Sequence, residues 1–147
     1  MSARPALTLL CAAVAALPAA EPVEFNRDIR PILSDNCFAC HGHDASHRKA
    51  KLRLDERDSA LKPAKSGAVA LVPGKPNDSE LIQRIVTTDP DEVMPPPDAH
   101  KPLAPEQKER LRQWIAAGAP YAAHWAFVPP AAAPVPSLPA ADAPTPI

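Results

Sequence analysis

The residues best suited to chemistry form the run Cys-Phe-Ala-Cys-His at positions 37–41. Two thiols separated by two residues can each add to one of the two vinyl groups of a haem, and a histidine directly after the second thiol then lies beneath the iron. This spacing favours covalent attachment of one haem c through Cys37 and Cys40. His41 is then the predicted proximal ligand of the iron.

Two other kinds of site compete for these cysteines. A thioredoxin-like dithiol calls for a strand before the motif and a long helix after it, whereas here a helix is predicted before the motif and Gly42 follows it. A structural zinc site needs four ligands. His43 and His47 lie nearby, but the remaining cysteine, Cys11, lies far from them in the N-terminal apolar stretch. Haem is therefore favoured, with the dithiol and zinc sites left as alternatives.

The far side of a haem iron needs a second ligand, and Met94 is the best candidate. It is the only methionine besides Met1, and it lies in the run Val-Met-Pro-Pro-Pro at 93–97. The prolines restrict the backbone, which suits a loop that holds a thioether over iron. Alternatively, Met94 fills a gap in the core. Among the histidines, His100 is the second candidate, His43 is expected on the proximal side, and His47 and His124 are expected to be solvated or to pack.

The first twenty residues have the features of a secretory signal. Arg4 is followed by an apolar stretch at 7–17 that is too short to span a membrane, and Ala19 and Ala20 precede Glu21. We expect residues 1–20 to be a signal peptide and the product to be periplasmic or otherwise exported, with no transmembrane helix once the signal is removed. The formal net charge of −1 gives no support for a nucleic-acid partner.

Three helices are expected to position these residues: 23–36, 78–87 and 105–117. Asn26 and Asn77 are the expected N-caps of the first two. Trp114 on the third helix is expected to be buried, either against the haem edge or against the first helix. The connections are expected to be loops, apart from a short extended piece at 52–55. Apolar residues at helical spacing predict the buried faces: Phe25, Ile29, Ile32 and Leu33; Leu81, Ile82, Ile85 and Val86; Leu111, Trp114 and Ile115.

The composition of the chain differs between a predicted folded domain and a predicted tail. The chain has 21 prolines and only 4% aromatic residues, so large core side chains are scarce and a buried haem would supply the missing apolar bulk. Beyond Val128 the chain is mostly proline and alanine. We therefore expect one domain at 21–128 and a linker or tail at 129–147. A chain that stops in a linker is expected to be the N-terminal piece of a longer protein.

Several motifs, taken in order, resemble the planctomycete-type cytochrome c domain over roughly residues 21–130. This resemblance implies an all-α cytochrome c fold wrapped around one haem c, with Cys37 and Cys40 attached, His41 proximal and Met94 distal. In longer members of the family, a Pro-rich linker leads to large C-terminal domains. Ala104 departs from the Ser or Thr that often begins the last helix. The motifs that carry the resemblance are 23–33 with 37–42, 52–55, 73–76 with 79–81, 94–96, 111–120 and 124–130.

Three functions remain possible. The favoured one is a non-enzymatic electron-transfer module, whose partner is a redox protein or a downstream domain of the same protein. The second is a haem enzyme or sensor in which the position of Met94 opens. The third is a haem-stabilised docking domain of a larger exported enzyme.

Overall fold

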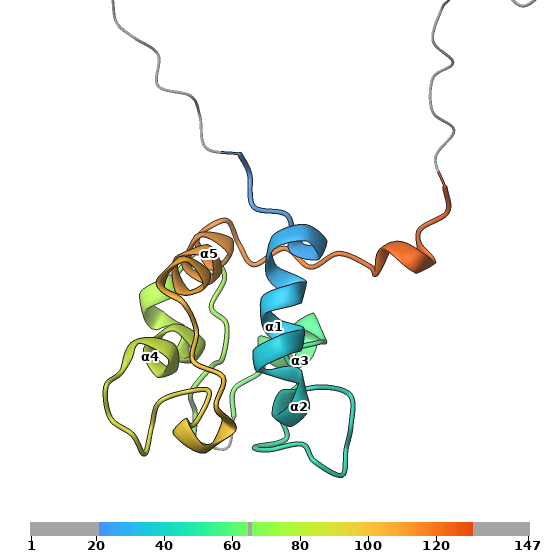
Figure 1. Cartoon of the computed structure of the whole chain (residues 1–147). Helices are drawn as coiled ribbons and strands as arrows, with labels where there is room; N and C mark the ends of the chain where they lie inside the picture. Colours follow the sequence, from blue (N-terminus) through green and yellow to red (C-terminus); the bar gives the residue numbers. More distant parts are fainter. Residues whose placement is uncertain (1–20, 65, 131–147) are drawn as a thin grey trace, which may run out of the picture.

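The computed structural model describes residues 21–64 and 66–130. Within these ranges the chain is helical and has no strand, apart from an isolated bridge between Pro63 and Val69 (Figure 1). The all-α prediction is confirmed. The predicted signal peptide and most of the predicted linker lie outside the described residues, and the domain limits stay predictions. No helix of the described part is both long enough and apolar enough to cross a membrane.

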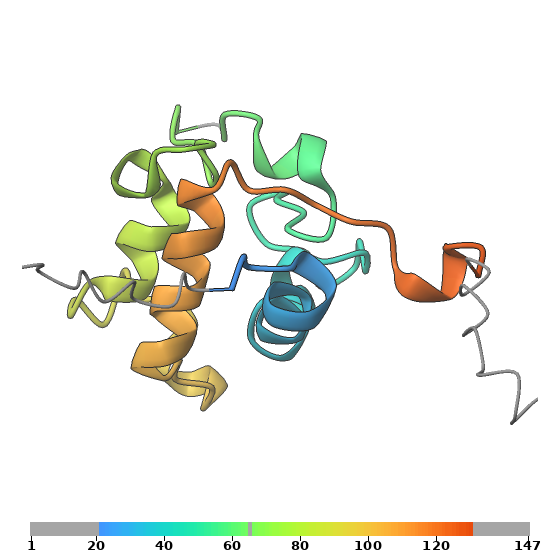
Figure 2. The same ribbon diagram turned by 90° about the horizontal axis from the view of Figure 1, so that it is seen from above.

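The helices form two groups that face each other. Helices α4 and α5 lie side by side, and α1, α2 and α3 form the other group (Figures 1 and 2). The chain after α5 runs past the beginning of the first helix. The elements are η1 (Phe25–Ile29), α1 (Arg30–Asn36), α2 (Phe38–His41), α3 (Arg57–Ala60), η2 (Pro76–Asp78), α4 (Glu80–Val86), η3 (Pro97–Ala99), α5 (Pro105–Ala116) and η4 (Trp125–Phe127).

The predicted first helix consists of two segments. Residues Phe25–Ile29 form a π-helical turn, closed by a bond from the Arg30 N–H to the Phe25 carbonyl, and α1 follows directly. Pro31 lies in the first turn of α1, where its missing N–H costs least. The apolar face is buried as predicted.

The predicted Asn26 cap is wrong. Glu24 precedes the helix, and its N–H donates to the Asp28 carboxylate at 2.8 Å. The Asn26 side chain instead donates to the carbonyl of Ala123 at 2.7 Å. The Asn26 Oδ1 atom, which would have accepted the cap bond, accepts instead from the Arg30 side chain at 2.8 Å.

The second helix begins later than predicted, because η2 precedes α4. Ser79, not Asn77, is the residue before α4. Ser79 is fully buried, and its hydroxyl accepts from the Val72 N–H and donates to the Lys75 carbonyl. Glu80 pairs with Arg84 at 2.7 Å. Val86 is 49% exposed because the helix ends there; Leu81, Ile82 and Ile85 are buried as predicted.

The last helix agrees with the prediction closely. Pro105 occupies its first turn, and Gly118 follows with a φ of +97°, a left-handed conformation that favours glycine. The Ala104 N–H donates to the Gln107 side chain at 2.9 Å, so half of a capping box survives without a Ser or Thr. The face formed by Leu111, Trp114 and Ile115 is fully buried.

Phe25, Trp114 and Tyr121 form an aromatic cluster that joins the first helix to the last. The ring centroids are 5.7 Å apart for Phe25 and Trp114, 4.5 Å for Phe25 and Tyr121, and 5.3 Å for Trp114 and Tyr121. The indole N–H of Trp114 donates to the Pro120 carbonyl at 2.9 Å, and the Tyr121 hydroxyl donates to the Leu54 carbonyl at 3.0 Å. The cluster therefore fixes η1 against the end of α5.

We expect Trp114→Phe to lower the free energy of unfolding by about 1–3 kcal/mol, because it shrinks a fully buried side chain and leaves the Pro120 carbonyl without its donor. Urea unfolding followed by circular dichroism measures the change. Phe127→Leu is the control, since Phe127 is 84% exposed and its substitution should change stability by less than about 0.5 kcal/mol. Equal effects of the two substitutions would contradict this account of the aromatic cluster.

Candidate cofactor site

The sequence 37–41 forms a short helical turn that continues from α1. The Cys37 N–H donates to the Leu33 carbonyl at 2.8 Å, and the N–H groups of Cys40 and His41 both donate to the Cys37 carbonyl, at 3.1 and 2.8 Å. Residues three and four apart on a helical turn share a face. The turn therefore brings the two thiols and the imidazole to the same side of the chain.

The segment after the turn folds back onto it. The Lys49 N–H donates to the Cys40 carbonyl at 2.8 Å, and the Leu54 N–H donates to the His41 carbonyl at 2.7 Å. Gly42 permits this path, because a Cβ at that position would collide with the carbonyl oxygen of Phe38. The end of the Cys-His turn is thus held by the main chain on both sides.

Cys37, Cys40, His41 and Met94 all line one cavity of about 720 Å³. This size lies in the range of pockets that hold cofactors and drug-sized ligands. Pro95 and Pro96 join Met94 in the lining. The rest is largely aliphatic and comes from both helical groups, including Leu52, Leu54, Ala70, Leu81, Ile85 and Leu111.

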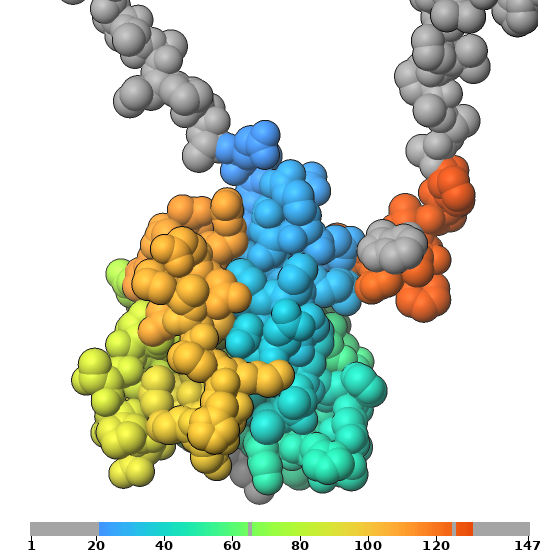
Figure 3. Space-filling view, viewed as in Figure 1, coloured from blue at the N-terminus to red at the C-terminus, as the bar shows by residue number. Residues whose placement is uncertain are grey.

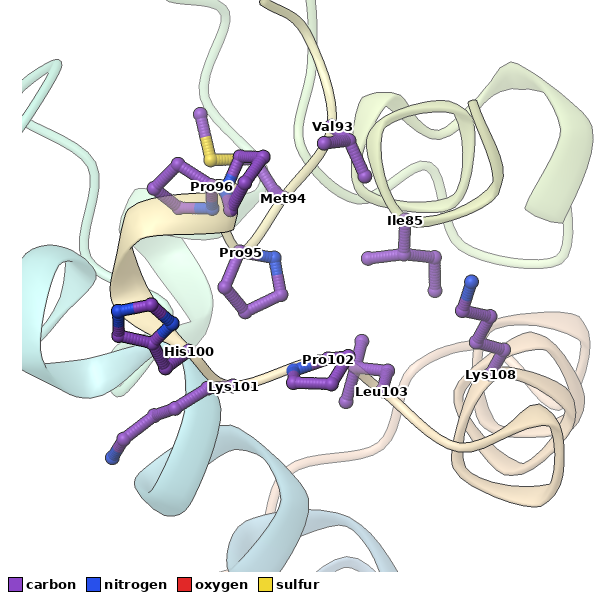
Figure 4. Close-up of a pocket in the computed structure, with 11 residues that line it drawn as sticks. Ile85, Val93, Met94, Pro95, Pro96, His100, Lys101, Pro102, Leu103 and Lys108 are labelled. Atoms are coloured by element: carbon purple, nitrogen blue, oxygen red, sulfur yellow. The ribbon is translucent and has the colours of Figure 1, made fainter. Parts of the chain in front are cut away.

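A smaller pocket of about 400 Å³ lies beside this cavity and shares Met94 with it. In Figure 4 the Met94 sulfur points away from the centre of the smaller pocket. His100, the second candidate for the distal ligand, lines the smaller pocket but not the larger one. Of these two candidates, Met94 alone shares a cavity with His41.

Burial shifts the pKa values of Cys37 and His41 in opposite directions. Burial, helped by the neighbouring Cys40, raises the pKa of the Cys37 thiol to about 11. A dithiol oxidoreductase needs the opposite, a thiol whose pKa is lowered, so this environment does not favour the dithiol alternative. Burial also lowers the pKa of His41. Its imidazole is therefore neutral near pH 7, which is the form that binds metals.

The His41 side chain fits a ligand role for a second reason. Its Nδ1 atom is buried and has no hydrogen-bond partner among the described residues. A buried polar group that the protein does not satisfy calls for a partner from elsewhere, and a bound group is one such partner. The two thiols, the neutral imidazole and the apolar walls together suit a haem.

A cluster of three or more His, Cys, Asp or Glu side chains that could hold a metal ion is absent from the described ranges. A haem iron needs only two ligands from the chain, so a haem site does not require such a cluster. His43 is exposed, and the Nδ1 atom of His47 lies 2.7 Å from an Asp44 carboxylate oxygen. His124 is half-buried.

Trp114 does not line either of the two pockets. It packs on Phe25, so the expected contact with the first helix is present. Its contact with a haem edge stays a prediction.

Arg84 was not predicted as a site residue, yet it anchors Met94. Its carbonyl accepts the Met94 N–H at 2.9 Å. Its guanidinium donates to the Glu80 carboxylate at 2.7 Å and to the Glu92 carbonyl at 3.3 Å. The spacing of Glu80 and Arg84 by four residues indicates a helical ion pair. No local sequence pattern predicts the hydrogen bonds that join Arg84 to the loop that carries Met94.

At the other end of the same loop, the Lys101 ammonium donates to the Asp35 carbonyl at 2.6 Å. The loop therefore bridges from α4 to α1 and closes over the gap between the two helical groups in the view of Figure 3. Lys101 was also missed by the sequence reasoning, because its partner lies 66 residues away.

We expect Arg84→Gln to loosen the loop that carries Met94. The substitution removes the guanidinium bonds to Glu80 and Glu92, whose joint loss should cost about 1 kcal/mol of local stability. Amide exchange at Val93 and Met94 should become roughly fivefold faster. Hydrogen exchange followed by NMR measures this rate.

The matched control is Arg112→Gln. Arg112 also donates a side-chain hydrogen bond, to Asn77 at 2.7 Å, but it lines neither pocket. This variant should leave exchange at Val93 and Met94 unchanged. Equal exchange rates in the Arg84 and Arg112 variants would refute the anchoring role of the Arg84 side chain.

Comparison with known proteins agrees with this geometry. Residues 37–98 match the model of the family described as Planctomycete cytochrome C. No curated protein and no solved structure matches the chain. The matched segment begins at Cys37 and includes Met94, and both residues line the cavity. Residues 37–98 are therefore similar to a planctomycete cytochrome c domain, and at a coarse level this similarity supports haem binding and electron transfer.

Proposed function

We propose that this chain is an exported c-type cytochrome domain that binds one haem c covalently and transfers electrons. One observation carries the proposal: Cys37, Cys40, His41 and Met94 line a single cavity of about 720 Å³, although Met94 lies far along the chain from the other three. Convergence of two thiols, an imidazole and a thioether on one apolar cavity is what a covalent, two-ligand haem requires.

Cys37 and Cys40 would hold the haem covalently. Each thiol would add across one vinyl double bond: the sulfur would bond to one vinyl carbon, the thiol hydrogen would go to the other, and nothing would leave. The addition consumes no oxidant, but both thiols must be reduced. Both are free in the structure, and Cys37 is protonated near neutral pH. The helical turn presents the two thiols on the same side as His41.

His41 and Met94 would be the proximal and distal ligands. When bound, haem c supplies an iron that exchanges one electron. The imidazole and the thioether would supply the two protein ligands of the iron, and the same two residues would hold it in both charge states. Thioether ligation and an apolar lining both favour the reduced form, which raises the reduction potential. Leu54, Leu81 and Leu111 contribute to that lining and limit the access of water.

The exposure of Met94 favours a second candidate function, a haem enzyme or sensor. Met94 is 37% exposed and borders the smaller pocket as well as the cavity. Movement of its side chain would open the distal side to a small ligand such as a peroxide or a diatomic gas. The contacts of Arg84 and Lys101 to the loop oppose this movement, so electron transfer is the better supported function.

The remaining parts of the proposal rest on the sequence. Export follows from the features of residues 1–20, and the electron donor or acceptor is a redox protein or a downstream domain joined through the proline-rich tail. A haem-stabilised docking role would use the same attachment chemistry. The docking role differs from electron transfer because it would not require the bound haem to exchange electrons.

We expect the chain to become coloured when it is expressed with a cytochrome c maturation system. Its haem should stay with the polypeptide on a denaturing gel, and the pyridine haemochrome spectrum should show two thioether links. Cys37→Ser or Cys40→Ser should leave one link, and the double variant should lose covalent haem. A colourless wild-type product would refute the proposal.

We expect Met94→Ala to remove the methionine–iron charge-transfer band from the spectrum of the oxidised protein. His100→Ala is the control and should keep the band, because His100 lines only the smaller of the two pockets. Carbon monoxide binding to the reduced protein separates the two candidate functions. It should be negligible in the wild type for electron transfer, and rapid for an enzyme or sensor. A band that survives Met94→Ala would show that the distal ligand is a different residue.

A further inference from the structure

The cavity that holds the candidate haem ligands has an excess of positive charge. Among the described residues, its lining includes the four basic residues Lys51, Lys62, Arg84 and Lys101 but only one acidic residue, Glu80. The other lining residues are mostly apolar or small. An apolar cavity with several cations at its edges suits an apolar ligand that carries negative groups.

Two of the four cations already have protein partners. Arg84 donates to Glu80 and to the Glu92 carbonyl, and Lys101 donates to the Asp35 carbonyl. The ammonium groups of Lys51 and Lys62 have no hydrogen-bond or ion-pair partner within the part of the chain that the structure describes. These two lysines are therefore available to an anionic group in the cavity.

The backbone at Lys51 is unusual. Its φ is +58°, and that of the preceding Ala50 is +52°. Side chains with a Cβ rarely adopt this left-handed conformation, and glycine takes it at the lowest cost. Ala50 and Lys51 are the central residues of a tight turn, which the Leu52 N–H closes by donating to the Lys49 carbonyl at 3.1 Å. This turn accounts for both φ values and places Lys51 at the edge of the cavity.

Lys51 and Lys62 belong to one continuous part of the cavity wall. Residues between 50 and 68 supply much of the lining, and the segment is tied together where the Ser59 hydroxyl accepts the Arg53 N–H at 3.0 Å. The wall that carries the thiols and His41 comes from a separate segment, the turn at 37–41. The two unpaired cations therefore lie on a different stretch of chain from the attachment residues.

We infer that Lys51 and Lys62 bind the two carboxylates of the haem, an inference that rests on the proposed function. Haem has two propionate side chains, and each can accept a charge-assisted hydrogen bond from an ammonium group. The thiols fix the ring at its vinyl groups, and the lysines fix it at its carboxylates.

This arrangement makes a prediction about pH. A nearby ammonium stabilises the ionised carboxylate and lowers its pKa. Ionisation of a propionate favours oxidised iron, so the reduction potential falls as the pH rises through that pKa. Loss of the ammonium raises the pKa of the carboxylate and moves this fall in potential to higher pH.

The experiment measures the reduction potential of the haem-loaded protein as a function of pH, by spectroelectrochemistry. In Lys51→Gln and in Lys62→Gln the fall in potential should move up by about 0.5–1 pH unit, less than for a fully buried pair because both lysines are exposed. The double variant should shift further. Lys51→Arg should restore the wild-type profile.

Lys49→Gln is the matched control. Lys49 is also exposed and lies two residues from Lys51, but it does not line the cavity. It removes the same charge and should leave the profile unchanged. Lys51→Gly is a second form of the test, because it removes the ammonium while easing the backbone strain, and it should shift the profile as Lys51→Gln does.

The outcomes separate this inference from the proposed function. If haem attaches and the profiles of Lys51→Gln, Lys62→Gln and Lys49→Gln coincide, the lysines do not bind the carboxylates and the cytochrome proposal stands. If the wild-type chain attaches no haem, the cytochrome proposal fails, and this inference fails with it.

Discussion

The packing of Phe25 against Trp114 and Tyr121 is the interaction on which the rest of the structure depends. It fixes the beginning of the first helix against the end of α5, with ring centroids 4.5–5.7 Å apart. From this end α1 runs to the turn that carries Cys37, Cys40 and His41 (Figure 1). The direction of α1 away from the aromatic cluster therefore determines where the thiols and the imidazole lie relative to α4 and α5.

The position of the aromatic cluster also explains the cavity. The chain is poor in aromatic residues, and its single tyrosine and Trp114 are used at one end of the molecule. None of the three rings lines the cavity, whose walls are mostly small and aliphatic side chains together with a few charged ones. The loop that carries Met94 is held at both ends, by Arg84 on α4 and by the contact of Lys101 with Asp35. The fold thus encloses space for an apolar body and does not fill it with its own side chains.

Much of this arrangement could be predicted from local patterns. The spacing of the thiols and His41 is a local property of one helical turn, and the apolar periodicity of 105–117 identified the buried face of α5. Neither predicted cap forms: the Asn26 Oδ1 accepts from Arg30 within the same helical stretch, and the Asn77 Oδ1 accepts from Arg112, which is distant in sequence. Arg84, Lys51 and Lys62 were missed because their role comes from the cavity, which forms only when separate segments meet.

The central claim is that Met94 faces His41 across one haem. The most direct test is an NMR spectrum of the reduced, haem-loaded protein with ¹³C-labelled methionine methyl groups. Met94 and Met1 are the only methionines, so the assignment needs at most one variant. The account predicts that the Met94 methyl proton resonance is shifted far upfield by the ring current of the haem above which it lies. A Met94 methyl resonance at the position of a free methionine would contradict the account.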